Sequence, residues 1–129
     1  MAIVDAVILL VDDVEDGRDI YSTYLTFKGY HVVCAASGDE ALARAREHRP
    51  DLILMDLSMP GLTGTQAMRA LRADDRFRSV PIVALTAHAL DDERREALQA
   101  GFDAVITKPC LPDELLAAIE ALFRARQTP

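Results

Sequence analysis

Five short apolar runs alternate with helix-like segments along the 129 residues of this chain. The runs have the length and composition of buried strands, and we place them at Val7–Val11, His31–Ala35, Leu52–Met55, Ile82–Leu85 and Val105–Thr107. Strands that alternate with helices predict a parallel sheet with right-handed crossovers and helices on both faces. The length suits one domain, which we expect to span residues 1–129 with a core over about residues 6–124.

The segments between the runs carry helix start and stop signals. The first helix is expected over about residues 14–28, with core spacing at Ile20, Tyr24 and Phe27. Ser37, followed by Glu40 three positions later, has the form of a capping box at the start of the second helix. The last helix should begin near Pro112 and carry apolar residues at Leu115, Leu116, Ile119, Leu122 and Phe123.

Four of the five runs stop on residues that can handle a metal ion or a phosphoryl group. In chain order these residues are Asp12 and Asp13, Asp56, Thr86 and Lys108. The carboxyl ends of parallel strands open on one edge of the sheet, where ligands of open α/β folds bind. We therefore expect three carboxylates, a hydroxyl and an ammonium to meet in one cleft.

Each of these residues has an ordinary explanation when taken alone. An acidic pair stabilises a helix start, aspartate is a frequent turn residue, and most lysines are solvated. Taken together they indicate phosphoryl chemistry. Adjacent carboxylates after a buried strand repel each other and need a cation, for which Mg²⁺ with its hard oxygen ligands is suited. Asp56 is then the candidate nucleophile, Lys108 the positive group and Thr86 the hydrogen-bond donor.

Composition excludes several other classes of function. The net charge of -7 argues against binding to nucleic acid, which depends largely on Lys and Arg contacts to phosphates. No apolar run approaches the ~18 residues of a membrane span, so we expect a cytoplasmic protein that does not bind membranes. Cys34 and Cys110 have neither disulfide-framework nor metal-ligand spacing, and both are expected as reduced thiols.

The ordered motifs resemble those of the receiver domains of two-component response regulators. The resemblance extends from about residue 6 to about residue 123. It rests on four motifs, which are Leu9-Leu10-Val11-Asp12-Asp13, Met55-Asp56-Leu57-Ser58-Met59-Pro60-Gly61, Leu85-Thr86-Ala87 and Lys108-Pro109.

The resemblance implies a flavodoxin-like fold, in which a doubly wound parallel sheet of five strands has the order 2-1-3-4-5. It implies that Asp56 accepts a phosphoryl group from a histidine kinase or histidine phosphotransfer protein, and that the protein then signals to a downstream partner. It also implies Mg²⁺ as the cofactor, held by Asp13, Asp56 and the backbone carbonyl of Ser58, with Asp12 assisting through a water. Lys108 would pair with the phosphoryl oxygens.

Four further expectations follow from the resemblance. Thr86 would move to hydrogen-bond a phosphoryl oxygen, and the Lys108-Pro109 peptide would be cis. Ser58 and His88, each two positions beyond a site residue, would tune the lifetime of the phosphoryl group. The face formed by the fourth helix, fifth strand and fifth helix would contact the partner, with contributions from Arg94, Arg95 and Val105, where many receivers carry an aromatic residue in place of the valine.

Two other functions remain open from the sequence. A phosphatase of the haloacid dehalogenase class also uses an aspartate nucleophile and Mg²⁺, but Asp12-Asp13-Val14 lacks the Asp-x-Asp pattern of that class. A phosphorylation-independent adaptor is the second alternative, although its acidic site would be free to decay, whereas the site is complete here. The chain could be a stand-alone protein or a receiver excised from a longer response regulator or hybrid kinase.

Overall fold

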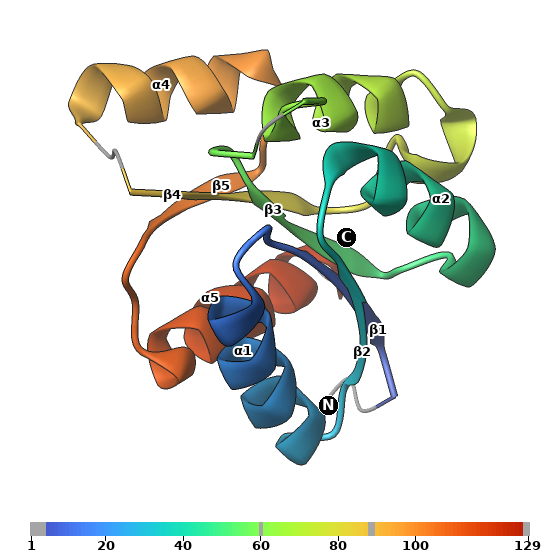
Figure 1. Cartoon of the computed structure of the whole chain (residues 1–129), viewed down its shortest axis with the longest axis vertical. Helices are drawn as coiled ribbons and strands as arrows, with labels where there is room; N and C mark the ends of the chain where they lie inside the picture. The colour runs from blue at the N-terminus through green and yellow to red at the C-terminus, as the bar shows by residue number, and fades with distance from the viewer. Residues whose placement is uncertain (1–4, 60, 88–89, 128–129) are drawn as a thin grey trace.

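A five-stranded parallel sheet forms the centre of the molecule in the computed structural model, which describes residues 5–59, 61–87 and 90–127 (Figure 1). Its strand order is β2-β1-β3-β4-β5. All four neighbouring pairs are parallel. The strands are β1 Val7–Val11, β2 His31–Ala35, β3 Leu52–Asp56, β4 Ile82–Thr86 and β5 Ala104–Thr107. The predicted flavodoxin-like sheet and its order are confirmed.

Helices cover both faces of the sheet. One face carries α1 Glu15–Phe27 and α5 Pro112–Gln127, and the other carries α2 Gly38–His48, α3 Gly64–Arg72 and α4 Asp91–Ala100 (Figure 1). A short 3-10 helix, Asp75–Phe77, precedes β4. None of the helices in the described part of the chain is long and apolar enough to cross a membrane.

The interior strand β1 shows why the apolar runs are continuous. Its residues alternate between two cores: Leu9 and Val11 pack with α2, α3 and α4, whereas Ile8 and Leu10 pack with α1 and α5. All four side chains are buried because the sheet has a helical layer on each side. A strand in this position has no solvent face, and this explains the absence of polar alternation in its sequence.

The rotation of α1 about its axis differs from the sequence prediction. Ile20 and Phe27, expected in the core, are 57% and 83% exposed, and the buried residues of this helix are Tyr21 and Leu25. The helix carries two apolar stripes, and periodicity alone does not say which one faces the sheet. Tyr21 can be buried because its hydroxyl donates to the Cys110 carbonyl at 2.9 Å.

Side-chain caps fix two of the loops near the carboxyl edge of the sheet. The Ser37 hydroxyl accepts a hydrogen bond from the Glu40 amide at 3.1 Å, at the predicted start of α2. At the start of α3, Thr63 and Gln66 form a reciprocal capping box that was not predicted from the sequence. This box ends the loop that follows Asp56 and so limits the freedom of that loop.

Candidate phosphoacceptor site

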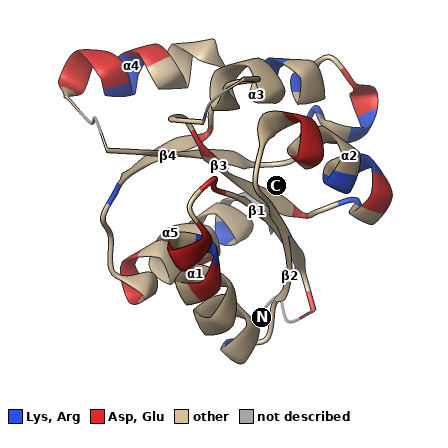
Figure 2. Cartoon of the chain, viewed as in Figure 1, with Lys and Arg blue, Asp and Glu red and all other residues tan. Residues whose placement is uncertain are grey.

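The residues predicted to converge do meet at the carboxyl edge of the sheet. Asp12 and Asp13 follow β1, Asp56 ends β3, Thr86 ends β4 and Lys108 follows β5. Carboxylate oxygens of the three aspartates lie within 4.8 Å of one another. Figure 2 shows acidic residues gathered at the end of β1 and in the first turn of α1. The arrangement is a compact acidic cluster at the edge where α/β folds bind their ligands.

The Lys108 ammonium joins two of these carboxylates. Its Nζ lies 3.1 Å from Oδ2 of Asp12 and 3.1 Å from Oδ2 of Asp56. The backbone holds the lysine in place because the Lys108 amide donates to the Thr86 carbonyl at 2.7 Å. The following peptide to Pro109 is cis, as the resemblance implied. A single cation therefore ties the ends of β1, β3 and β5 together.

Asp12 is fully buried and held at three points. Its Oδ1 accepts from the Val14 amide at 2.9 Å, and its Oδ2 contacts Lys108. Its backbone carbonyl accepts from the Arg18 guanidinium at 2.7 Å. Arg18 was not predicted from the sequence, although an arginine at the end of the first turn of a helix that starts beside an acidic pair is a recognisable signal. These contacts leave Asp12 little room to move.

Asp56 and Asp13 differ in their access to solvent. Asp56 is buried, and its Oδ1 accepts from the Ser58 amide at 2.9 Å, whereas Asp13 is exposed. The cluster thus has a buried floor of Asp12 and Asp56 and an open side at Asp13. A hydrated cation can approach from that side and keep some of its waters, which is the mode of binding that Mg²⁺ favours.

Burial makes the charged form of Asp56 unfavourable. Desolvation raises the pKa of Asp56 above its ordinary value of 3.8, and the hydrogen bonds from the Ser58 amide and Lys108 offset only part of this rise. Desolvation lowers the pKa of Lys108, but its hydrogen bonds to Asp12 and Asp56 outweigh that effect and leave the pKa raised. At neutral pH the cluster therefore holds a charged ammonium beside a carboxylate, Asp56, whose desolvation is only partly offset.

The residues predicted to tune the site and contact a partner lie in different environments. Ser58 is exposed beside Asp56, and His88 lies outside the described residues. Arg94 is exposed on α4 and donates to the Val105 carbonyl at 3.2 Å. Arg95 is also exposed, and its Nη1 lies 3.6 Å from Oδ1 of Asp92.

The Val105 side chain is buried in the sheet core, so it meets no partner directly and can act only through its neighbours.

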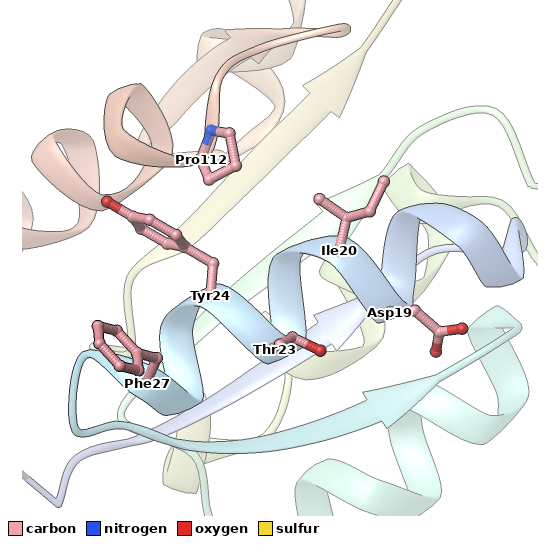
Figure 3. A pocket seen from close by; sticks show the side chains of 6 residues that line it. All are labelled: Asp19, Ile20, Thr23, Tyr24, Phe27 and Pro112. Atoms are coloured by element: carbon pink, nitrogen blue, oxygen red, sulfur yellow. The ribbon is translucent and has the colours of Figure 1, made fainter.

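A separate apolar hollow lies on the outward face of α1 (Figure 3). It has a volume of about 580 Å³ and is lined by Asp19, Ile20, Thr23, Tyr24, Phe27 and Pro112. Ile20 and Phe27, which the sequence pattern had placed in the core, thus line this hollow. The hollow has a single carboxylate among its lining residues, and it therefore lacks the cation-binding chemistry of the acidic cluster.

Comparisons with known proteins agree with this geometry. Residues 8–120 match the family described as response regulator receiver domain. The chain is 34% identical over 114 residues to the polar-differentiation response regulator DivK of Brucella anthropi, an alignment that covers 88% of this chain and 93% of DivK. It is 40% identical over 119 residues to the transcriptional regulatory protein PrrA of Mycobacterium tuberculosis, covering 92% of this chain and 50% of PrrA.

A solved structure provides a third comparison. The receiver domain of the sensor histidine kinase PA1611 from Pseudomonas aeruginosa, which has a magnesium ion coordinated in its active site cleft, is 38% identical to this chain. The two superpose with a TM-score of 0.83 over 91% of this chain and 96% of the other.

The chain therefore belongs to the response regulator receiver family. Receiver domains accept phosphate from histidine kinases, and they are signalling switches rather than enzymes that turn over a separate substrate. Membership of this family favours the switch over the phosphatase that the sequence had left open.

The raised pKa of Asp56 predicts a pH-dependent effect of the Asp56→Asn substitution. A folded-state pKa above the unfolded value means that this group favours folding at low pH and loses that contribution as pH rises through the folded pKa. Without Mg²⁺, Asp56→Asn should therefore be more stable than the wild type at pH 7, and the advantage should shrink toward pH 4. Urea unfolding across this range measures it, with the exposed Glu96→Gln as control. An advantage independent of pH would contradict the prediction.

Proposed function

We propose that Asp56 is the phosphoacceptor of this receiver domain. The observation that carries the proposal is the Lys108 ammonium at 3.1 Å from both Asp12 and Asp56, within a cluster of three carboxylates. Asp56 combines burial, contact with the cation and a position at the end of the central strand β3. In the reaction, a carboxylate oxygen of Asp56 bonds to phosphorus, and the bond from phosphorus to the donor's histidine nitrogen breaks. The donor imidazole leaves with the electron pair.

The three carboxylates also fit Mg²⁺. Oxygen atoms within 4.8 Å of one another suit a small hard cation, and the exposed side at Asp13 leaves room for its waters. We assign Asp13, Asp56 and the backbone carbonyl of Ser58 as direct ligands, with Asp12 acting through a water. When bound, Mg²⁺ neutralises negative charge on the carboxylates and on the entering phosphoryl oxygens.

Lys108 and Thr86 would bind the phosphoryl group once it is attached. The ammonium already lies against Asp56 and needs only a short movement to reach a phosphoryl oxygen. Thr86 is buried at the end of β4, and its carbonyl accepts from the Lys108 amide. The two residues are therefore joined through their backbones beside Asp56.

The remaining assignments rest on the family and on the position of each residue. The donor is a histidine kinase or a histidine phosphotransfer protein, and a downstream protein reads the phosphorylated state. The receiver domain spans residues 1–129 with a core over residues 6–124, and it acts in the cytoplasm. Ser58, exposed beside Asp56, and His88 tune the lifetime of the phosphoryl group by controlling access to it.

We further propose that the signal leaves through α4, β5 and α5. Because Val105 is too small to make the large rotamer swing of an aromatic residue, the movement of Thr86 must pass along the chain to the start of α4. Arg94 connects that start to β5 through its hydrogen bond to the Val105 carbonyl. Together with Arg95, it presents positive charge to a partner on an otherwise acidic first turn.

Phosphorylation should be lost in the Asp56→Asn variant, because an amide cannot form the acyl phosphate. Incubation with Mg²⁺ and acetyl phosphate, followed by intact mass spectrometry, should add one phosphoryl group to the wild type and none to the variant. Asp16→Asn, which removes an exposed carboxylate from α1, is the matched control and should label normally. Undiminished labelling of Asp56→Asn would refute the assignment, and an unlabelled wild type would favour the adaptor.

Mg²⁺ should bind more weakly to Asp13→Ala, by roughly tenfold, which corresponds to ~1.4 kcal/mol. The same variant should keep its fold or gain slightly in stability, because it relieves repulsion among the carboxylates. The chain has no tryptophan, so calorimetry and amide chemical shifts are the suitable measurements. Glu15→Gln serves as the control, and an unchanged Mg²⁺ titration of Asp13→Ala would show that the ligands lie elsewhere.

Beryllofluoride with Mg²⁺ should shift the amide resonances of residues 86–95 and of Val105, because the route runs from Thr86 to α4. In Arg94→Ala the shift at Val105 should be reduced, whereas Arg95→Ala should leave it unchanged because Arg95 pairs with Asp92 instead. Shifts confined to the Asp56 loop in the wild type would rule out the route.

A further inference from the structure

Gly17 lies in the first turn of α1, directly against the acidic cluster. A β-carbon at this position would be 2.8 Å from Oδ2 of Asp12 and 3.6 Å from its Cγ. The backbone of Gly17 has an ordinary negative φ, unlike that of Gly29, Gly61 and Gly101, so its conformation does not require glycine. Inside a helix, glycine is less favourable than alanine. The feature at this position that favours glycine is therefore the space that Asp12 occupies.

Asp12 cannot easily yield that space. It is fully buried, its Oδ1 is held by the Val14 amide, and its carbonyl is held by the Arg18 guanidinium. The oxygen that a β-carbon would push is Oδ2, the same atom that contacts the Lys108 ammonium. A methyl group on residue 17 would therefore act on the contact between Asp12 and Lys108 before it disturbed the core.

We propose that Gly17 is a positioning residue of the phosphoacceptor site. By leaving out a β-carbon, it lets α1 begin close against Asp12 and keeps Oδ2 where Lys108 meets it. The cost is a weaker first turn of the helix, so the residue exchanges local stability for the geometry of the site. The consequence for phosphorylation rests on the proposed function, whereas the contact between Gly17 and Asp12 does not.

Thermal stability tests the contact without reference to function. In an Asp12→Ala background the obstructing carboxylate is gone, and Gly17→Ala should raise the melting temperature by about 3 °C through helix propensity. In the native background, Gly17→Ala should leave the melting temperature unchanged or lower it. Thr23→Ala, an exposed position of α1, should raise the melting temperature equally in both backgrounds. An equal gain from Gly17→Ala in both backgrounds would overturn the proposal.

Ligand binding tests the consequence for the site. Gly17→Ala should slow labelling by acetyl phosphate about tenfold and weaken binding of beryllofluoride with Mg²⁺, while Thr23→Ala should match the wild type in both. If acetyl phosphate labels the wild type and Gly17→Ala at the same rate, the positioning role of Gly17 is wrong, but the proposed function of the domain stands. If the wild type itself fails to label, the proposed function is wrong, and the stability comparison still decides the contact.

The double variant covers the case in which Gly17→Ala does not fold. Asp12→Ala with Gly17→Ala removes the obstruction and should recover a cooperative unfolding transition. Failure of the double variant to fold, where Asp12→Ala alone does fold, would show that glycine is needed for the backbone and not for Asp12. That result would also overturn the proposal.

Discussion

The Lys108 ammonium between Asp12 and Asp56 is the interaction on which the rest of the site depends. It brings together residues from the ends of β1, β3 and β5, which are far apart in the sequence, at 3.1 Å from each carboxylate. Two buried carboxylates without this cation would carry a large desolvation and repulsion penalty. The sheet order makes the contact possible, because β3 lies beside β1 and the strands that follow it lead directly to β5.

The balance of charge at the site leaves it ready for a ligand. The Lys108 ammonium contacts two of the three carboxylates, and the burial of Asp56 raises its pKa, so the folded protein carries unfavourable charge at this edge. Such a site gains stability from a divalent cation and changes its balance again when a phosphoryl group is added. The Lys108 amide donates to the Thr86 carbonyl, so the backbone that carries the ammonium is joined to the end of β4. In the proposed mechanism, this connection is the first step of the route by which the signal leaves the site.

The first helix presents one face to the site and the core and leaves the other exposed. Its first turn is fitted to Asp12, through the bare backbone of Gly17 and the Arg18 guanidinium. Farther along, Tyr21 and Leu25 seal the core, and Ile20 and Phe27 remain exposed beside the hollow on the outer face. The likeness to DivK and to the PA1611 receiver extends over about nine-tenths of the chain, and so α1 belongs to the region that these proteins share.

Periodicity and strand-end chemistry in the sequence determined the sheet, the helices and the residues that converge on the site. Each of these depends on local pattern: buried strands are continuously apolar, and parallel strands bring their carboxyl ends to one edge. The tertiary structure decided the rotation of α1, because its two apolar stripes fit the pattern equally and only packing against the Cys110 loop selects Tyr21. It also decided the fit of Gly17 against Asp12, because a close approach between a helix and a buried carboxylate leaves no periodic trace in the sequence.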